Sequence, residues 1–485
     1  MSQLQTVLGL GVVALVIDLV IRLVALVVVP RNRLPTAAMA WLLAIFFIPV
    51  IGVLLYLAIG SPKLPKDRRR KQVEMNAAIE EQSNEHANPG PEGAPEWLDS
   101  VVTLNRNLTA MPLVAGNAAE LIDDYAGALA AMAAEVDAAT SFVHVEFYIL
   151  SSDQATAGFF ASLERAVARG VTVRVLLDHW ASSHCRDYEA TITRLGAMGA
   201  QWHLMLPVQP LHGRYQRLDL RNHRKLLVVD GRVGFVGSQN VIDRSYNKKK
   251  NLSRGLKWQE LMCRIEGPVV ASIDLVFSTD WYLESGEKLA VAVRETPALV
   301  RGDLACQVVP SGPGYQVENN LQLFLSLLYS ARERIIITSP YFVPDDSMLR
   351  GLLAATARGV HVELFVSEIG DQGLVWHAQR SYYRALLEAG VQIYCYPAPF
   401  ILHAKHFSID DELALIGSSN MDMRSFALNS EISMMVHSKT FVADMRAVER
   451  GYRDISRSLT LPEWRLEPRK ATVLDGLARL TSALQ

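Results

Sequence analysis

Beyond about residue 113, the apolar and polar positions of the chain follow two alternating patterns. Short apolar runs typical of buried strands are separated by longer stretches whose apolar residues recur at the spacing of a helix face. Each half has the order strand, helix, strand, reading SFVHVEFYIL, AGFFASLERAVARG and VTVRVLLD, then RIIITSPYFV, MLRGLLAATARG and VHVELFVS. This order predicts an α/β protein in which a mixed β-sheet is flanked by helices.

The two halves also share landmarks in the same order, which indicates an internal duplication. The matching positions are Tyr148 with Tyr341, Gly170 with Gly359, and His223 with His403. We therefore expect two lobes related by a pseudo-twofold axis, over residues 113–300 and 301–460.

The N-terminal part follows a different pattern, in which two long apolar segments contain very few charges. Residues 7–29 are apolar except for Asp18 and Arg22, which lie four apart and can pair on one helix face. Residues 37–60 carry no charge, and roughly 20 apolar residues suffice to span a bilayer. The pattern predicts a transmembrane helical hairpin over residues 1–60.

Three residues bear on how the second apolar segment meets the membrane. Trp41 and Tyr56 lie toward its two ends, where an aromatic belt is expected. Pro49 lies between them and leaves open whether the segment spans the bilayer or re-enters it. A cleaved signal peptide is the alternative for the first segment, but no basic stretch precedes that segment and a second one follows at once.

Basic residues flank the hairpin unevenly. The connector PRNRLPT has two arginines, whereas KLPKDRRRK after the second segment has six basic residues. The positive-inside rule then places the chain after residue 60 in the cytoplasm. Residues 61–112 are expected to form a linker with local helix, and residues 461–485 an amphipathic tail.

Composition excludes several classes of protein. The 485 residues carry a formal net charge of −2, unlike the clearly basic proteins that coat nucleic acids, so no nucleic-acid partner is expected. A hydrophobic fraction of 50% is high for a soluble protein and agrees with a soluble body joined to membrane segments. The four cysteines are scattered and form no CxxC pair, which argues against a disulfide framework and a structural zinc site.

One polar constellation occurs twice in the strand-rich body. Residues 222–240 read NHRKLLVVDGRVGFVGSQN, and residues 402–420 read LHAKHFSIDDELALIGSSN. The histidine and the lysine point to the same side of a strand, an aspartate-led turn reverses the chain, and Gly-Ser-x-Asn ends the return strand. Each hairpin therefore presents an imidazole, an ammonium, a hydroxyl and an amide at one edge of a sheet.

Two such clusters that face each other suit chemistry at a phosphodiester. The reaction needs a nucleophile on one side of phosphorus and a proton donor for the leaving oxygen on the other, and two histidines supply both. The lysines would stabilise the charged pentacoordinate phosphorus in place of a metal ion. We therefore expect no metal and no cofactor.

The doubled motif resembles the signature of the phospholipase D superfamily, His-x-Lys-x4-Asp followed by Gly-Ser-x-Asn. The resemblance implies that His223 attacks phosphorus to form a phosphohistidine while His403 protonates the leaving alcohol, although the sequence leaves the reverse order open. It implies a catalytic set of His223, Lys225, Asp230, His403, Lys405 and Asp410. It also implies phosphate contacts from Lys225, Lys405, Ser238, Asn240, Ser418 and Asn420, and histidine-orienting carboxylates at Glu260 and Glu431.

Some of these positions carry further expectations. The motif aspartates, Asp230 and Asp410, fall at the far ends of their strands, so structural roles are expected of them. Glu260 lies in the strand-like KWQELMCRI, where a surface carboxylate is the alternative, and Glu431 lies in LNSEISMMV.

The resemblance narrows to the bacterial cardiolipin synthases and extends over nearly the whole chain, including SPYFVPDD, RSYYRALLEAGVQIYCY and EWRLEPRKATVLDGLARLTSAL. It implies a multi-pass enzyme of the bacterial inner membrane that joins two phosphatidylglycerol molecules into cardiolipin and releases glycerol. Phosphatidylglycerol and anionic membrane lipids are the implied partners, and a homodimer is left open. Two departures are Gly-Ser-Gln-Asn, where many of these enzymes have Gly-Gly-x-Asn, and the Trp-Gln-Glu that ends at Glu260, where an aspartate is more usual.

Other proteins with the same motif remain as alternatives. A hydrolytic phospholipase D uses water as the acceptor, and another phosphatidyltransferase uses a different alcohol. A membrane-tethered nuclease shares the chemistry, but the near-neutral charge and two apolar segments count against it. A scaffold without activity is expected to have lost a motif histidine or lysine, and both copies are intact.

Two further features leave alternatives open. The end of the chain, VLDGLARLTSAL, has amphipathic spacing and lies either on the membrane or against the body. Basic residues around the first motif either hold anionic headgroups or form a solvated loop, and they are Arg214, Arg217, Arg221, Lys248, Lys249, Lys250, Arg254 and Lys257.

Overall fold

The computed structural model describes residues 2–31, 35–60, 64–84, 93–209, 214–215, 217–289, 300–315 and 318–480. It divides into two compact units, one over Met1–Lys63 with Arg217–Asp219, and one over Leu64–Gln216 with Leu220–Gln485. The second unit, here called the body, contains both copies of the motif.

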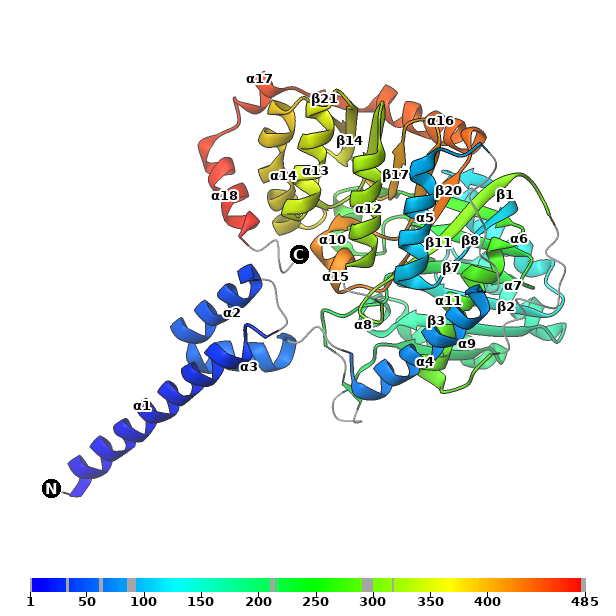
Figure 1. The fold of residues 1–485 in the computed structure, drawn as a ribbon. Coiled ribbons are helices and arrows are strands. Elements are labelled where there is room, and N and C mark those ends of the chain that lie inside the picture. The colour runs from blue at the N-terminus through cyan, green and yellow to red at the C-terminus, as the bar shows by residue number, and fades with distance from the viewer. Residues whose placement is uncertain are drawn as a thin grey trace. The chain divides into compact units, whose positions relative to one another are not determined.

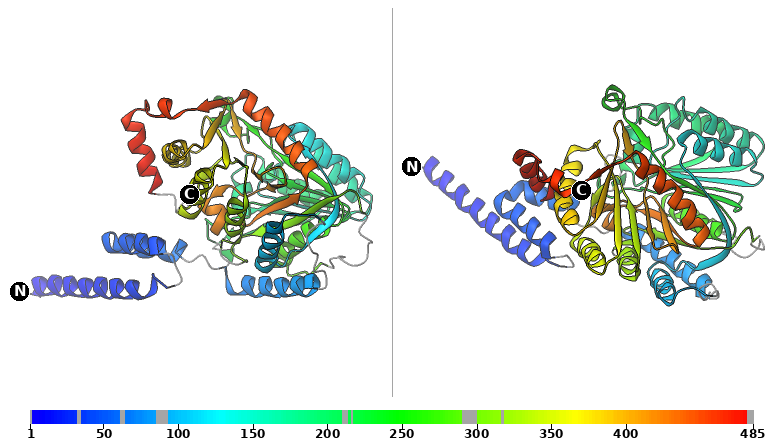
Figure 2. Two further views of the ribbon diagram at one scale, coloured as in Figure 1. Left: turned by 45° about the horizontal axis from the view of Figure 1, so that its top comes forward. Right: turned by 90° about the horizontal axis from the view of Figure 1, so that it is seen from above.

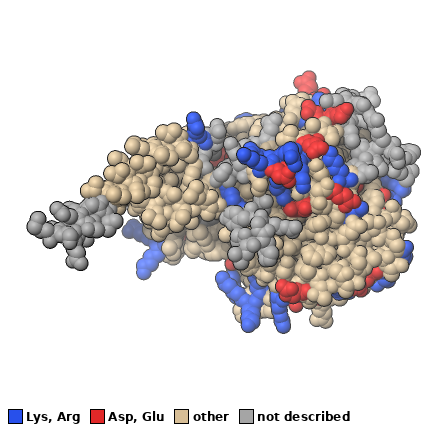
Figure 3. Space-filling view, turned by 90° about the horizontal axis from the view of Figure 1, so that it is seen from below, with Lys and Arg blue, Asp and Glu red and all other residues tan. Residues whose placement is uncertain are grey.

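The N-terminal unit is built from three apolar helices, α1 (Ser2–Val28), α2 (Pro35–Phe47) and α3 (Pro49–Ile59). Among the described helices, α1 alone is long and apolar enough to cross a membrane, over Gly11–Val28. The expected pair on that helix is confirmed, because Arg22 Nε lies 2.8 Å from Asp18 Oδ2. The helices of this unit present a nearly uncharged surface, whereas both signs of charge are scattered over the body (Figure 3).

The second apolar segment, for which the sequence left open whether it spans or re-enters, forms two helices. The chain breaks at Ile48 and a new helix starts at Pro49. Proline has no N–H to donate, and its ring clashes with the carbonyl four residues earlier, so a helix ends before it. The helix after the break folds back along α2, so Trp41 and Tyr56 meet edge to face with ring centroids 5.5 Å apart. These two aromatic residues therefore do not mark opposite ends of one span.

The body contains two copies of one sheet. In the first copy the strand order is β4-β3-β2-β7-β8-β10-β1, and in the second it is β15-β14-β12-β17-β18-β20-β11, with β21 added beside β15. The strands of the first copy are β1 (Leu113–Ile122), β2 (Phe142–Phe147), β3 (Thr172–Asp178), β4 (Gln201–Met205), β7 (Lys225–Val229), β8 (Val233–Gly237) and β10 (Met262–Glu266). Those of the second are β11 (Leu304–Ser311), β12 (Arg334–Thr338), β14 (His361–Ser367), β15 (Gln392–Tyr396), β17 (His406–Ile409), β18 (Leu413–Gly417), β20 (Glu431–His437) and β21 (Arg457–Leu459).

The two copies are joined at their first strands. Strands β1 and β11 pair antiparallel, so the described body has one continuous mixed sheet of 15 strands (Figures 1 and 2). Matching strand orders on either side of this junction confirm the predicted fold, two α/β lobes related by a pseudo-twofold axis. The lobe boundaries 113–300 and 301–460 stay predictions.

Helices cover both faces of this sheet, and three clusters of buried apolar side chains lie between the layers. In the first lobe the long helices are α6 (Tyr125–Asp137), α7 (Ala157–Ala168), α9 (Tyr188–Met198) and α11 (Val269–Ser285). In the second they are α12 (Asn319–Ser330), α13 (Asp346–Ala357), α14 (Gly373–Glu388) and α16 (Lys439–Ile455). Shorter elements are α8 (His179–Ser183), α10 (Lys249–Ser253), α15 (Met423–Ala427), α17 (Leu461–Trp464), α18 (Arg469–Arg479), β5 (Val208–Gln209), β6 (Arg214–Tyr215), β9 (Lys257–Gln259), β13 (Phe342–Val343), β16 (Phe400–Leu402) and β19 (Met421–Asp422).

The expected linker is more ordered than its composition indicates. It contains α4 (Lys66–Asn84) and α5 (Glu96–Thr109), and its residues 85–92 lie outside the described residues. Arg68 of the first helix pairs with Glu284 at 2.7 Å, and the second helix buries Leu98 fully in the core. Both helices therefore pack on the body.

Candidate active site

Two short parallel pairings between the lobes bring the motifs together. Asn222 of the first lobe forms a parallel bridge with Ser430 of the second, and the His223 amide donates to the Ser430 carbonyl at 2.8 Å. At the equivalent place, Leu402 of β16 pairs in parallel with Gln259 of β9. Each lobe thus contributes one strand end to each pairing.

The pairings place each histidine beside a carboxylate of the opposite lobe. In a parallel pair the next residues along both chains are also neighbours, and these are His223 with Glu431 and His403 with Glu260. The Nδ1 atom of His223 lies 2.9 Å from Glu431 Oε2, and the Nδ1 atom of His403 lies 2.8 Å from Glu260 Oε1. The expected carboxylates therefore lie at the histidines, crossed between lobes, and Glu260 is buried, contrary to the surface alternative.

The motif serines hold these carboxylates. The hydroxyl of Ser238 donates to Glu260 at 2.6 Å and accepts from the Leu261 amide at 2.9 Å. The hydroxyl of Ser418 makes the same contacts with Glu431 and the Ile432 amide. Both hydroxyls are fully buried and engaged in these contacts, and their expected phosphate contacts stay predictions. Each serine fixes the glutamate that orients a histidine.

Both motif lysines are buried close to the histidines. The Lys225 ammonium donates to the His223 carbonyl and lies 5.3 Å from the centroid of the Tyr148 ring. The Lys405 ammonium donates to the His403 carbonyl in the same way. Burial is the largest influence on both and lowers the pKa of Lys225 to about 7 and that of Lys405 to about 8.

Burial also decides the protonation of the histidines. It lowers the pKa of His223 and of His403 to about 4, against the attraction of the neighbouring glutamates. Burial alone would raise the pKa of Glu260 and Glu431, but the adjacent imidazoles and lysines outweigh it and hold both values below the ordinary one. At neutral pH each Nδ1–H therefore donates to a carboxylate, and Nε2 has no hydrogen-bond partner among the described residues.

The two motif asparagines differ between the lobes. Both polar atoms of the Asn240 side chain already form hydrogen bonds within the protein. Its Oδ1 accepts from the Ile149 amide at 3.0 Å, and its Nδ2 donates to the Tyr246 hydroxyl at 2.9 Å. The Nδ2 amide of Asn420, in contrast, donates to none of the described residues and stays available as a donor, and its Oδ1 atom is buried without a hydrogen-bond partner among them. Phosphate contact is therefore better supported for Asn420 than for Asn240.

The motif aspartates lie away from the histidines, as strand geometry predicts. Asp230 follows β7 and accepts hydrogen bonds from the backbone amides of 140–142 at the start of β2. Asp410 follows β17 and accepts from the amides of 332–334 at the start of β12. Their φ angles of 53° and 49° suit the tight turns that follow. Each aspartate ties a motif hairpin to the neighbouring strand.

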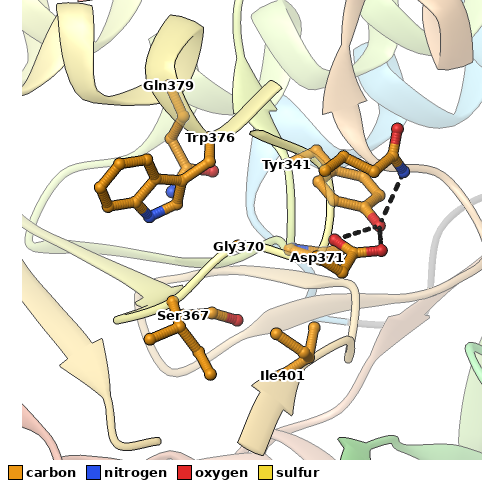
Figure 4. Close-up of a pocket in the computed structure, with 10 residues that line it drawn as sticks. Tyr341, Ser367, Gly370, Asp371, Trp376, Gln379 and Ile401 are labelled. Atoms are coloured by element: carbon orange, nitrogen blue, oxygen red, sulfur yellow. Dashed lines mark hydrogen bonds between the residues drawn. The ribbon is translucent and has the colours of Figure 1, made fainter. Parts of the chain in front are cut away.

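A pocket opens beside the second motif, between β16 and the start of α14 (Figure 4). The Tyr341 hydroxyl donates to Asp371 at 3.0 Å and accepts from Gln372 at 3.1 Å. The ring of Tyr341 has its centroid 6.4 Å from that of His403. The pocket is lined by Pro340, Tyr341, Ser367, Ile369, Gly370, Asp371, Gln372, Trp376, Gln379 and Ile401.

The basic residues around the first motif divide into two groups. Arg221 is buried and its Nη1 lies 3.5 Å from Asp178 Oδ1, whereas Arg217 pairs with its neighbour Asp219. The group at α10 is exposed, and Arg254 Nη2 donates to the carbonyl of the pocket residue Gly370 at 3.2 Å. The side chain of Arg214 lies outside the described residues.

Three tyrosines of the site were not among the predicted site residues. Tyr148 lies edge-on to His223 with ring centroids 4.9 Å apart, and Tyr341 does the same at His403. The hydroxyl of Tyr246 donates to Glu260 at 3.3 Å. Recurrence of Tyr148 and Tyr341 after equivalent strands was the signal that identifies them. No comparable signal marks Tyr246.

Comparisons with known proteins agree with this geometry. The family model described as "Cardiolipin synthase, PLD-like domain" matches residues 132–281 and 324–449, one stretch in each lobe. A second, described as "Phospholipase_D-nuclease N-terminal", matches residues 13–61.

Whole-chain relatives are similar over nearly their full length. Cardiolipin synthase A of Pectobacterium carotovorum subsp. carotovorum (strain PC1) is 32% identical over 469 residues, covering 95% of both chains. Cardiolipin synthase of Geobacillus kaustophilus (strain HTA426) is 30% identical over 484 residues, covering 98% of this chain and 94% of its own. The crystal structure of phosphatidylserine synthase from Haemophilus influenzae Rd KW20 has a TM-score of 0.61 at 14% identity, covering 79% of this chain and 99% of its own. That structure shares the fold.

Proposed function

Because the chain belongs to the bacterial cardiolipin synthases of the phospholipase D superfamily, it is a membrane-associated phospholipid phosphatidyltransferase, and we propose that it joins two phosphatidylglycerol molecules into cardiolipin and releases glycerol. We also propose that α1–α3 hold it in the bacterial inner membrane as a multi-pass protein with a cytoplasmic body.

The first step forms a covalent intermediate on His223. Its Nδ1–H is donated to Glu431, so Nε2 carries the lone pair that attacks phosphorus. His403 takes up a proton on Nε2 when the anionic phosphodiester binds. A P–N bond then forms, the P–O bond to the glycerol headgroup breaks, and the leaving oxygen takes that proton from Nε2 of His403. The products are phosphatidyl-His223, free glycerol and a neutral His403.

The second step transfers the phosphatidyl group to a second lipid. A headgroup hydroxyl of another phosphatidylglycerol gives its proton to His403 and attacks phosphorus, and the P–N bond breaks. Glu260 stabilises the imidazolium that forms, as Glu431 does at the other histidine. The enzyme returns to its starting protonation state, and one cardiolipin leaves.

The lysines link substrate binding to protonation. An anionic phosphodiester between the lobes raises the pKa values of Lys225, Lys405 and His403, which burial lowers in the empty site. Binding therefore charges the groups that the transition state needs. We assign the phosphate contacts to both lysines and Asn420, and positioning roles to Ser238 and Ser418.

The acceptor approaches from the His403 side in this proposal. The pocket beside His403 carries the hydroxyl of Tyr341 and the carboxylate of Asp371, which suit a polyhydroxyl headgroup. Exposed cations of α10 lie at its edge, where an anionic lipid phosphate would be attracted. A lipid hydroxyl held there competes with water for the intermediate.

One observation carries the proposal: the two crossed pairs, His223 with Glu431 and His403 with Glu260, form a single buried site from both lobes. Two histidines held in the same way can serve the two sides of the reaction, one attacking phosphorus and the other protonating the leaving oxygen.

Purified protein in vesicles of phosphatidylglycerol tests the proposal, with lipids and glycerol identified by mass spectrometry. We expect cardiolipin and glycerol in equal amounts from the native chain and neither product from His223→Ala. From His403→Ala we expect no cardiolipin and at most one glycerol per chain. Phosphatidic acid as the main product would show a hydrolase instead. A product containing an added alcohol such as serine, in preference to cardiolipin, would show a different acceptor.

A further inference from the structure

The C-terminal helix α18 exposes apolar side chains and buries a carboxylate, the opposite of an ordinary surface helix. Its side toward α14 carries Asp475, which is 2% exposed, and Ala478. Its outward side carries Val473, Leu474 and Leu477, each more than half exposed, and Leu480 follows at 81% exposed. Apolar side chains thus face outward while a carboxylate faces the protein.

Buried polar contacts fix this orientation. Asp475 Oδ1 lies 2.6 Å from Nδ1 of His377, and Asp475 Oδ2 lies 3.4 Å from Nε of Arg380, both on α14. The Arg380 guanidinium is held between Trp376 and Trp464, with distances of 4.6 and 4.7 Å to the ring centroids. Rolling the helix to hide its apolar side would leave a buried charge unpaired, which is strongly unfavourable.

The surroundings of the helix define what fits its outward side. Leu466, just before α18, is 84% exposed, so the apolar surface continues beyond the helix. Arg465, Arg469 and Lys470 are exposed at the same end. Apolar side chains flanked by exposed cations are the pattern of a helix that lies in the interface of an anionic bilayer.

We infer that α18 is an interfacial membrane helix, with Val473, Leu474, Leu477 and Leu480 inserted among the acyl chains of an anionic bilayer. Its polar side stays against α14. The sequence leaves open whether this segment lies on the membrane or against the body, and in this arrangement one helix does both. This contact is separate from any spanning segment of the N-terminal unit.

Membrane contact at α18 also bears on substrate entry, a point that rests on the proposed function. Helix α14 holds Asp475 of α18 and also supplies Trp376 and Gln379 to the pocket beside His403. A bilayer bound at α18 would therefore be connected to the pocket through α14, and the acceptor lipid would be drawn from that bilayer.

A depth measurement in the full chain tests the membrane contact. A fluorescent label is placed at Leu477→Cys and, as a matched control, at Ala168→Cys on the exposed end of α7, both with Cys185→Ser because that thiol is the partly exposed one. The protein is reconstituted in vesicles of phosphatidylglycerol and phosphatidylethanolamine. We expect lipid-borne nitroxides to quench the label at 477 several-fold more than at 168, and aqueous iodide to quench it several-fold less.

Two outcomes would overturn the inference. Equal iodide quenching at 477 and 168 would place the helix in water. Protection of 477 from both iodide and lipid-borne nitroxides would show that protein covers it, either the N-terminal helices or a second copy of the chain.

Activity gives a second, independent test. The double variant Leu474→Glu/Leu477→Glu should turn over phosphatidylglycerol in vesicles about tenfold more slowly, because charges oppose insertion, while detergent-dispersed substrate is turned over within about twofold of native. Tyr329→Glu, at a comparably exposed apolar position on α12, is the control and should match native in both assays. Native rates for the double variant on vesicles would contradict the inference. If the native chain makes no cardiolipin in either assay, the proposed function fails, while the depth measurement still decides the membrane contact.

Discussion

At each motif histidine, a chain of three side chains fixes which imidazole nitrogen carries the proton. Serine donates to glutamate, glutamate accepts from Nδ1, and Nε2 remains available for phosphorus or for an alcohol oxygen. The two motif lysines are buried beside these histidines, and burial lowers their pKa values. An empty site is therefore low in positive charge, and a bound phosphodiester restores it.

Ligand binding should consequently take up protons. A phosphonate analogue of phosphatidylglycerol, which cannot transfer its headgroup, should bind more weakly as pH rises through about 7 to about 8, because Lys225 and Lys405 lose their protons in the empty site. Calorimetry in buffers of different ionisation enthalpy measures the proton uptake directly. His403→Ala removes one proton acceptor and should lower the uptake.

Binding that is independent of pH between about pH 6 and about pH 9, with no proton uptake, would contradict this electrostatic account.

The crossed glutamates should control different steps. Glu431→Gln weakens His223 as a nucleophile and should slow formation of the phosphatidyl-enzyme by about 10- to 100-fold, whereas Glu260→Gln should slow its transfer to the acceptor by a similar factor. Rapid-quench kinetics separate the two steps, since only the second variant should show a burst of glycerol. Glu388→Gln, on the exposed side of α14, is the control. A glycerol burst in Glu431→Gln instead would reverse the assignment of the histidines.

Residue types and spacing predict much of this site from the sequence. The motif places His223, Lys225, His403 and Lys405 because their roles depend on chemistry that few side chains supply. The serines were assigned to phosphate because a hydroxyl can serve either a ligand or a neighbouring carboxylate. That choice depends on where Glu260 and Glu431 lie in three dimensions.

The two motif hairpins are the elements that position the histidines. Asp230 and Asp410 adopt positive φ at the turns and accept several backbone amides from the neighbouring strand. Strand alternation predicts their place at the far ends, and the structure agrees, so we propose that they stabilise the hairpins and do not take part in the chemistry.

Asp230→Asn and Asp410→Asn should each lower the free energy of unfolding by about 2 kcal/mol, because charge-assisted hydrogen bonds to backbone amides are weakened. Urea denaturation in detergent measures the change, with the exposed Asp411→Asn as the control. Turnover per folded molecule should fall far less than in the histidine variants. Loss of turnover with native stability would assign the aspartates to the chemistry instead.

Two other features of the fold are not predicted by the sequence. The pairing of β9 with β16 involves three residues per strand from different lobes, so no local pattern indicates it. The break between α2 and α3 is different, since Pro49 indicates a discontinuity but apolar composition alone does not show that the chain folds back. Sequence patterns thus fail in two ways. They do not indicate pairing between distant strands, and hydropathy alone does not tell whether an apolar segment folds back on itself.

At the scale of the whole molecule, duplication brings two half-sites into one. The antiparallel pair of β1 and β11 continues one sheet through both lobes, and the parallel pairings near the histidines close the site. Recurring order along the chain predicts the two lobes. It cannot predict which carboxylate serves which histidine, because either lobe offers one.

A site built within one chain should not be restored by combining two defective chains. Co-expressed His223→Ala and His403→Ala chains with different tags, purified as any mixed complex, should be as inactive as either variant alone, because both lobes of one chain supply each site. Recovery of about half of native turnover, as expected if a symmetric dimer exchanged lobes, would contradict this.

The central claim is that the two lobes of one chain hold a single phosphorus between His223 and His403. The most direct measurement is mass spectrometry, at neutral pH, of peptides from His403→Ala after incubation with phosphatidylglycerol. The account predicts a phosphatidyl group on His223 that forms slowly, because the leaving oxygen lacks its acid, and then persists because its transfer lacks a base. It predicts none in His223→Ala. A phosphatidyl group on any other residue of His403→Ala, or on His403 in His223→Ala, would contradict it.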